Sequence, residues 1–438
     1  MKRHKTMKIN IVGAGLAGCE AAYYLASRGY EVQLFEMKPV CFTPAHKSEN
    51  FAELVCSNSL KGADPYSNAC GLLKEEMRAF GSLIMQAAQA SAIPAGGALA
   101  VDRDVFSAFV TDKIKSHPNI TCVNGEVDSI PPTPCIIATG PLTGDKLSDA
   151  IASKLGAPLH FYDASAPIVS RESVDLASAF FGDRYGKGGD DYLNCPLNKD
   201  EYEHFVTELI SAERAIFHSF EKREIFEGCM PLEIMAARGM ETLRFGPFKP
   251  VGLRDKDGNK FYAVLQLRKE NASGTAYNLV GCQTNLKFAE QKRVFSLIPA
   301  LKNAEFLRYG VMHRNTYLNS PDYLDADFSL KGEPLLFFAG QMTGVEGYVE
   351  SAASGLLCGI HMAQRLAKKQ VIIPPDTTVL GALSAHICGA TDNFQPMNAN
   401  FGILRASEKS IRDKKQRYRY LAERALNDIQ KYKSLIQG

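Results

Sequence analysis

The stretch from Lys8 to Glu36 most constrains what this chain can fold into. A short apolar run is followed by Gly13-x-Gly15-x-x-Gly18, then by a helical pattern, then by a second apolar run that ends on Glu36. In such a β-α-β unit the first glycine makes a tight turn, the second lets the backbone approach a pyrophosphate, and the third lets helix pack on strand. The terminal acid can accept hydrogen bonds from ribose hydroxyls. We therefore predict that this unit binds a dinucleotide.

Length and composition narrow the class of protein. The 438 residues can hold two or three domains, and a net charge of +2 gives no overall preference for nucleic acid. The chain has no run of 18 apolar residues and no signal-peptide pattern, so we expect a cytoplasmic protein without membrane contact. Eleven cysteines without a Cys-x-x-Cys pair predict neither a disulfide framework nor a metal site.

Two later strand ends carry glycines and favour FAD over NAD. They read Ala-Thr139-Gly140 and Phe-Ala-Gly340-Gln341, and a helical pattern follows the second. In doubly wound sheets ligands bind at the carboxyl ends of the strands, where a strand-glycine-helix junction can direct N–H groups at a pyrophosphate or a flavin. Two plain strand ends without a ligand are the alternative.

The order of apolar patterns indicates an α/β protein whose first domain is interrupted. From about residue 176 the β-α-β rhythm gives way to short strands and acidic helical pieces, and it returns with a buried strand at residues 335–339. We predict a discontinuous Rossmann-like FAD-binding domain with an inserted α+β domain. The expected boundaries are 1–175 and 305–438 for the FAD-binding domain and 176–304 for the insert.

Helical periodicity predicts further elements. We expect one helix over residues 69–92, a short helix from Ser48, and a basic C-terminal helix over residues 405–433. Ile411, Tyr418, Ala422, Ala425, Ile429 and Tyr432 should lie on one face of that last helix. Its Lys and Arg residues then form a solvated face or, as the alternative, a surface that contacts phosphates.

Two cysteines stand in settings that suit chemistry. Cys229 comes just before Pro231, which suits the start of a helix ending near Gly239, and a helix N-terminus favours the thiolate. Cys56 lies among turn-forming residues in the loop after the ribose-binding strand. Taken alone, a cysteine in either setting is more often a buried structural residue than a nucleophile. Five other cysteines lie in apolar surroundings and should be core residues: Cys19, Cys122, Cys135, Cys282 and Cys358.

Longer motifs carry a family resemblance from about Lys8 to beyond Gly402. They include TPAHKSENFAELVCSNSLKG, PAGGALAVDR, FEGCMPLEIMAARG, FGPFKPVGL and FFAGQMTGVEGYVESAASG. In these strings the chain resembles the folate- and FAD-dependent tRNA uracil-C5 methyltransferase family, TrmFO. The strings are far more specific than the dinucleotide fingerprint.

The resemblance implies an enzyme that methylates C5 of the T-loop uridine of tRNA. It implies 5,10-methylenetetrahydrofolate as carbon donor, FAD as redox cofactor, and NADPH or NADH as reductant. Cys229 would add to C6 of the uracil and Cys56 would move the C5 proton, although the two roles could be exchanged. The base would have to leave its stack to react. No stable protein partner is implied.

The resemblance also assigns cofactor and RNA contacts. The FAD-binding residues would be Gly13, Ala14, Gly15, Leu16, Ala17, Gly18, Glu36, Gly340, Gln341 and Tyr348. His46 would lie near the folate or be a surface histidine. The candidate phosphate contacts within the motifs are Arg238, Arg244, Lys249, Arg268 and Arg314.

Several other functions remain open at this stage. The same chemistry could act on a uridine of 23S rRNA, because the active-site motifs would not distinguish the two substrates. Flavoproteins that modify wobble uridines are similar in the FAD domain but longer. An oxidoreductase of small amines would leave both cysteines structural, and a non-catalytic RNA-binding protein would use FAD only for stability.

Overall fold

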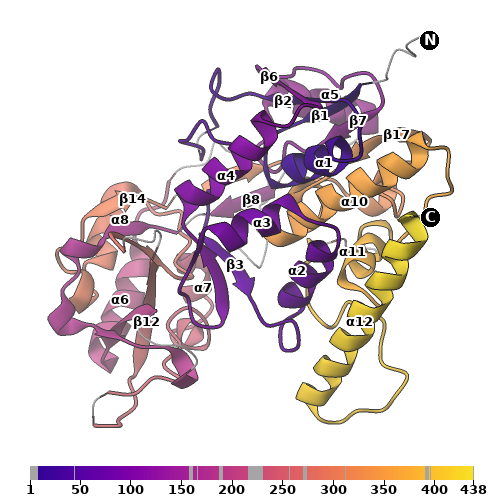
Figure 1. The fold of residues 1–438 in the computed structure, drawn as a ribbon. Coiled ribbons are helices and arrows are strands. Elements are labelled where there is room, and N and C mark those ends of the chain that lie inside the picture. The colour runs from indigo at the N-terminus through magenta and orange to yellow at the C-terminus, as the bar shows by residue number, and fades with distance from the viewer. Residues whose placement is uncertain are drawn as a thin grey trace.

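The structure is a computed structural model that describes residues 8–43, 45–156, 161–164, 166–186, 191–215, 230–255, 257–269, 274–310, 312–389, 394 and 396–437. Residues 161–164, 186 and 312–315 are described as backbone only. Figure 1 shows the arrangement of the elements. No helix of the described residues is long and apolar enough to cross a membrane.

The first sheet joins strands from both ends of the chain (Figure 1). Its order is β16 (Ser329–Leu330), β17 (Glu333–Phe338), β7 (Cys135–Ile137), β1 (Ile9–Val12), β2 (Val32–Glu36) and β6 (Ile120–Asn124). All neighbours except β16 and β17 pair in parallel. Parallel strands are buried on both faces, which explains their nearly continuous apolar runs. The expected Rossmann-like α/β fold is confirmed, with the late strand β17 placed beside β7.

Two helices cover this sheet in close contact with each other. Helix α1 (Leu16–Ala26) packs along α10 (Tyr348–Leu366), as Figure 1 shows. A side chain at Gly355 would place its Cβ 2.1 Å from the carbonyl oxygen of Ala17. The approach of the two backbones therefore depends on this glycine. This close packing brings the start of α10 to the edge of the sheet at which α1 begins.

A second, antiparallel sheet forms a separate lobe at the lower left of Figure 1. Its order is β10 (Phe180–Phe181), β11 (Tyr192–Leu197), β12 (Ala263–Lys269), β13 (Ala276–Leu279), β9 (Ile168–Ser170) and β14 (Phe306–Arg308). The lobe has its own hydrophobic core, to which α6 (Lys199–Ser211) and α8 (Phe288–Phe295) contribute Phe205 and Phe295. Strands β9 and β14 belong to this sheet although they lie outside residues 176–304. The domain boundaries themselves stay a prediction.

The helix expected over residues 69–92 is wrong, because two helices form there. They are α2 (Ala69–Ala79) and α3 (Leu83–Ala90). Gly81 between them has φ +75°, a conformation that ends a helix at little cost only for glycine. The hydroxyl of Ser82 then accepts from the N–H of Met85 at 3.2 Å and caps α3.

The basic C-terminal helix starts later than expected. Helix α12 spans Lys414–Gln437 rather than residues 405–433. The Asp413 carboxylate accepts from the N–H of Gln416 at 2.8 Å, so Asp413 supplies the cap. The guanidinium of Arg424 binds the carbonyl oxygens of Arg405 and Ala406, which folds the preceding segment back along the helix. Of the expected apolar face, Ala422, Ala425, Ile429 and Tyr432 are buried.

The remaining elements connect these layers. A three-stranded sheet contains β3 (Ser59–Gly62), β5 (Ala98–Val101) and β4 (Ala92–Ile93), and a two-stranded sheet contains β15 (Met312–Asn315) and β8 (Phe161–Ala164). The other α-helices are α4 (Arg103–Lys115), α5 (Asp145–Leu155), α7 (Leu232–Ala236), α9 (Ser320–Tyr323) and α11 (Val379–Cys388). Short 3₁₀ turns occur at Arg171–Ser173, Leu176–Ser178, Arg184–Gly186, Thr242–Phe245, Pro299–Leu301 and Gln341–Thr343.

Candidate functional site

The turn between β1 and α1 uses its glycines in different ways. Gly13 has φ +98°, and a Cβ there would lie 2.6 Å from the carbonyl oxygen of Ala138. A Cβ on Gly18 would lie 1.8 Å from the carbonyl oxygen of Gly13. Both glycines are therefore required by the fold itself. At Gly15 a Cβ would meet no atom within 4 Å, so the space beside this residue is open.

That open space lies at the N-terminus of α1. Gly15 is the N-cap of the helix, and no side chain of the described residues caps it. The first N–H groups of a helix and its positive dipole end favour a bound anion. Gly15, Leu16 and Ala17 line a pocket at this point. The arrangement fits the pyrophosphate of a dinucleotide.

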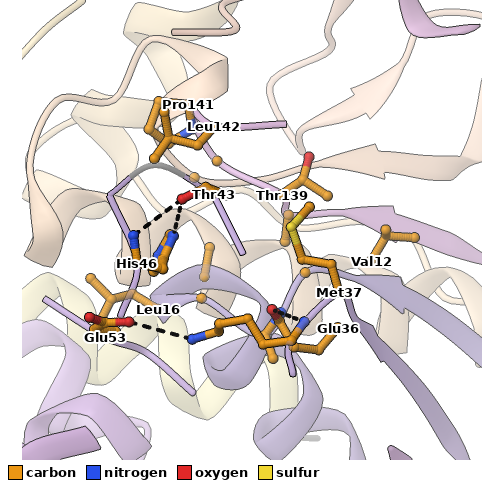
Figure 2. A pocket seen from close by; sticks show the side chains of 18 of the residues that line it. Val12, Leu16, Glu36, Met37, Thr43, His46, Glu53, Thr139, Pro141 and Leu142 are labelled. Atoms are coloured by element: carbon orange, nitrogen blue, oxygen red, sulfur yellow. Dashed lines mark hydrogen bonds and ion pairs between the residues drawn. The ribbon is translucent and has the colours of Figure 1, made fainter. Parts of the chain in front are cut away.

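Glu36 ends β2 at the rim of the same turn. One carboxylate oxygen accepts from the N–H of Ala14 at 2.8 Å, and the other accepts from the N–H of Lys38 at 3.1 Å. The carboxylate is buried but lines the pocket (Figure 2). A carboxylate has about four acceptor positions, so two stay available for ribose hydroxyls after these bonds.

One pocket brings together nearly all the residues predicted to bind the cofactor. It encloses about 1140 Å³, counting its open mouth. The predicted residues that line it are Gly13, Ala14, Gly15, Leu16, Ala17, Glu36, Thr139, Gly140, Gly340, Gln341 and Tyr348. Gly18 lies behind the turn and packs it instead. Residues that line the pocket come from the ends of β2, β1 and β7 and from the start of α10.

The loop after β2 brings the predicted His46 to the pocket and adds Lys38, Thr43 and Glu53, which were not predicted. The Lys38 ammonium bonds to the carbonyl oxygen of Ser48 at 3.1 Å and lies 3.7 Å from the Glu53 carboxylate. The hydroxyl of Thr43 and the Nδ1 of His46 lie 2.6 Å apart (Figure 2). All of these except Ser48 line the pocket. The helix expected from Ser48 is wrong, because residues 49–50 form a bend and residues 51–52 a turn.

The second strand-glycine junction differs in detail from the expectation. Gly340 has φ +86°, and its N–H donates to the hydroxyl of Ser354 at 2.7 Å. That N–H is therefore not directed at a ligand. The side-chain amide of Gln341 donates to Glu346 at 2.9 Å while Gln341 lines the pocket. The roles predicted for both residues stay predictions.

Tyr348 links the pocket to the first of the two candidate thiols. Its hydroxyl oxygen accepts from the N–H of Cys56 at 2.7 Å and from the N–H of Ser57 at 3.2 Å. Burial, with the Cys56 side chain as the next cause, raises the pKa of Tyr348, so the hydroxyl keeps its proton. Val55 lines the pocket beside Tyr348. The half-buried Cys56 is therefore the next residue in the chain after Val55, which lines the pocket.

The second candidate thiol, Cys229, lies outside the described residues. The helix after it is shorter than expected: α7 ends at Ala236 and has Pro231 at its N-cap. Of the cysteines assigned to the core, Cys19, Cys135, Cys282 and Cys358 are buried, whereas Cys122 is half-buried. No group of three or more His, Cys, Asp or Glu among the described residues could hold a metal ion.

The residues predicted to contact RNA differ in how exposed their side chains are. Lys249 is exposed on the second lobe, and Arg244 pairs with Glu241 and lies over the ring of Tyr262. The side chain of Arg314 lies outside the described residues. Arg268 is only 6% exposed, which contradicts its assignment as a phosphate contact. Its guanidinium is directed into the protein, toward the loop that follows Cys56.

Comparisons with known proteins agree on one family. The model of the family described as "Glucose inhibited division protein A" matches residues 8–370. A protein of Staphylococcus saprophyticus is 55% identical over 435 residues, which cover 98% of this chain and 100% of the relative. One of Acetivibrio thermocellus is 56% identical over 430 residues, covering 97% and 98%. Both relatives are named methylenetetrahydrofolate--tRNA-(uracil-5-)-methyltransferase TrmFO.

A solved structure with a similar fold is that of Aquifex aeolicus GidA. It matches with a TM-score of 0.71 and 16% identity, over 98% of this chain and 73% of the GidA chain. At that identity the likeness concerns the fold alone. The near full-length identity to the curated relatives is the stronger finding, and it shows that this chain belongs to the methylenetetrahydrofolate--tRNA-(uracil-5-)-methyltransferase TrmFO family.

Proposed function

We propose that this protein methylates C5 of a uridine in tRNA, with 5,10-methylenetetrahydrofolate as the carbon donor. The observation that carries the proposal is the identity of 55% and 56%, over almost the whole chain, to relatives named for this activity. The GidA likeness does not compete with it, because its identity is 16%. The protein would act in the cytoplasm, where its RNA substrate is found.

The pocket between β1, β2 and β7 is the proposed FAD site. The helix N-terminus at Gly15 would hold the pyrophosphate, and Glu36 would bind the ribose. Gly340, Gln341 and Tyr348 would border the flavin end. When bound, FAD supplies the redox chemistry that completes the methyl group, with NADPH or NADH as the source of electrons.

The thiols would make the uracil reactive. C5 of uracil is a poor nucleophile, and a thiolate that adds at C6 turns C5 into an enolate carbon able to attack a one-carbon electrophile. We assign this addition to Cys229 and the later removal of the C5 proton to Cys56. The hydroxyl of Tyr348 would hold the Cys56 backbone against the pocket. Loss of the C5 proton would release the one-carbon unit from its carrier, and once a hydride had completed the methyl group the thiolate would leave C6 and restore the ring.

A reconstitution experiment tests the proposal. The purified protein is incubated with a tRNA transcript, 5,10-methylenetetrahydrofolate, FAD and NADPH, and 5-methyluridine is measured by nucleoside mass spectrometry. We expect product from the wild type, and a loss of at least about a hundredfold in Cys56→Ala and Cys229→Ala. Cys41→Ala is the matched control, because Cys41 is exposed and does not line the pocket.

The RNA used as substrate separates the alternatives. A transcript whose T-loop uridine is replaced by cytidine should give no product. If product forms only on a fragment of 23S rRNA, the chemistry stands but the tRNA assignment is wrong. If no RNA is methylated and small amines are oxidised equally by wild type and both cysteine variants, the methyltransferase assignment is wrong.

A further inference from the structure

Arg268 connects the second lobe to the loop that carries Cys56. It lies in β12, and its Nε donates to Oδ1 of Asn58 at 2.8 Å. A terminal guanidinium nitrogen donates to the hydroxyl oxygen of Ser57 at 2.6 Å. A planar guanidinium can hold two acceptors at once in a fixed geometry. The two residues directly after Cys56 are therefore held by one side chain that belongs to another sheet.

Asn58 adds further hydrogen bonds to this contact between the two lobes. It is fully buried, and its amide nitrogen donates to the carbonyl oxygens of Lys269 at 2.6 Å and Val101 at 3.2 Å. Its oxygen accepts from Arg268. Every hydrogen-bonding atom of the amide is thus used, and two of the three bonds go to β12. Loss of the guanidinium would leave a buried oxygen without its donor.

The first lobe holds the same loop from the other side. The hydroxyl of Tyr348, on the first turn of α10, accepts from the N–H groups of Cys56 and Ser57. On the same turn the carboxylate of Glu350 pairs with the ammonium of Lys61 at 2.8 Å. Residues 56–61 are therefore fixed to α10 at two points. From the second sheet, β12 holds the same loop through the Arg268 guanidinium and through the carbonyl oxygen of Lys269.

We infer that Arg268 is a positioning residue for Cys56, which couples the second sheet to the thiol loop at the edge of the dinucleotide pocket. Its burial and its inward bonds to Ser57 and Asn58 explain why it is not placed to contact phosphates. The loop geometry beside Cys56 then depends on the position of β12. The consequence for turnover rests on the proposed function, in which Cys56 is a catalytic thiol.

Three variants of the full-length protein test the inference. Arg268→Gln removes the charge and the paired donors, and Arg268→Lys keeps the charge but cannot bond to Ser57 and Asn58 in the same way. Arg293→Gln is the matched control. Arg293 lies on α8 of the same lobe, is 44% exposed, and pairs with Glu290 and Glu208 on the surface.

Hydrogen exchange followed by mass spectrometry gives a readout that needs neither RNA nor folate. In Arg268→Gln we expect exchange in peptides covering residues 54–60 to be at least about tenfold faster, the factor that a hydrogen bond to a charged group is worth. Peptides from β13 should keep the wild-type rate. Arg268→Lys should fall between, and Arg293→Gln should match the wild type. Equal rates at residues 54–60 in all variants would overturn the inference, as would faster exchange throughout the second sheet.

Kinetics separate positioning from RNA binding. In Arg268→Gln we expect kcat to fall by about tenfold to a hundredfold, with the KM for tRNA unchanged. A raised KM with unchanged kcat would instead make Arg268 an RNA contact and overturn the inference. If the wild type methylates no RNA while the exchange result holds, the proposed function fails and the structural coupling stands.

Discussion

Single residues of the first turn differ in whether the fold or the ligand requires them. Gly13 and Gly18 face protein backbone at distances that exclude a Cβ, whereas Gly15 faces open space. The sequence motif does not distinguish these two roles, because all three positions are glycine. The structure therefore distinguishes substitutions that should damage the turn from one that should affect only the ligand.

Gly15→Ala should fold normally and bind FAD poorly. Its added methyl group meets no protein atom within 4 Å, and φ at Gly15 is −76°, which any residue adopts. The methyl group would occupy the space through which a pyrophosphate approaches the helix N-terminus. We expect the melting temperature of the apoprotein to stay within about 2 °C of wild type, and the FAD dissociation constant to rise at least about tenfold.

Gly18→Ala is the contrasting variant for that measurement. Its Cβ would lie 1.8 Å from a backbone oxygen, so the turn itself must move. We expect a lower melting temperature of the apoprotein together with loss of flavin. If Gly15→Ala bound FAD with wild-type affinity, the phosphate would not lie at this turn.

Some site residues could be predicted from the sequence because their signal is local. The glycines, Glu36 and the two strand-end motifs lie within short patterns that have known geometry. The partners of Arg268 lie 210 and 211 residues away, and no periodicity connects them. The bond between Tyr348 and Cys56 spans 292 residues. Such contacts follow from the packing of two lobes, which the sequence pattern does not describe.

At the scale of elements, two buried carboxylates cap helices far away in sequence. Glu20 of α1 accepts from the N–H groups of Leu83 and Ile84 at the start of α3. Glu76 of α2 accepts from the N–H groups of Val379 and Leu380 at the start of α11, at 2.8 and 2.9 Å. The oxygens of both carboxyl groups accept from free N–H groups that begin a helix. These caps fix the relative positions of four helices.

The buried caps should make stability depend on pH. Burial raises the pKa of Glu76 from 4.5 to about 8, against the smaller lowering by its two N–H donors. The folded state therefore holds the proton more tightly than the unfolded state. This contribution is fully present below about pH 4.5 and is lost as pH rises through about 8. We expect the free energy of unfolding to fall over this range, by at most about 1.4 kcal/mol per pH unit from this group.

Glu76→Gln should reduce that slope in urea titrations at pH 5, 6, 7 and 8. It should not abolish it, because burial also raises the pKa of Glu20, to about 7. Glu75→Gln is the matched control, since Glu75 is a partly exposed neighbour paired with Arg78. Slopes are compared rather than absolute stabilities, because glutamine also loses one acceptor. Equal slopes in wild type and Glu76→Gln would contradict the prediction.

Helix boundaries were harder to predict than helices. The 3.6-residue pattern continues across residues 69–92, and only the positive φ of Gly81 and the cap of Ser82 divide it. The donor groups freed by that break are satisfied by Glu20 from α1. A contact 63 residues away thus stabilises the break. Where the partner is distant, periodicity alone cannot locate the end of an element.

At the scale of the whole molecule, the chain returns to its first sheet after building the second lobe. Strand β17 pairs with β7, and α10 packs on α1, so the late glycine junction reaches the early phosphate turn. The return of β-α-β rhythm after residue 335 predicted this closure. The seam between the lobes was not predicted, because it consists of single polar contacts such as Asp191 with Gly96 and Arg268 with Asn58.

One face of the C-terminal helix is buried against the protein, and its other face carries the Lys and Arg residues that could contact phosphates. Tyr432 meets Phe80 edge-on at 5.9 Å and is buried, whereas Lys414 and Lys415 are exposed. Several cations of the helix already have partners: Arg419 pairs with Glu423, and Lys431 pairs with Asp428. This favours a solvated face over a phosphate-binding one.

We therefore expect the double variant Lys414→Ala/Lys415→Ala to show the wild-type dependence of tRNA affinity on salt concentration. Each lost phosphate contact would reduce the slope of log affinity against log salt by about 0.9, so two contacts would be detected easily. Tyr432→Ala serves as the variant of the buried face. It should lower the free energy of unfolding by about 3 kcal/mol through the cavity it leaves, while the folded protein keeps the wild-type salt slope. A slope reduced by about 1.8 in the double lysine variant would instead show that both lysines contact phosphates. The RNA would then reach α12, on the side of the first lobe away from the second sheet (Figure 1).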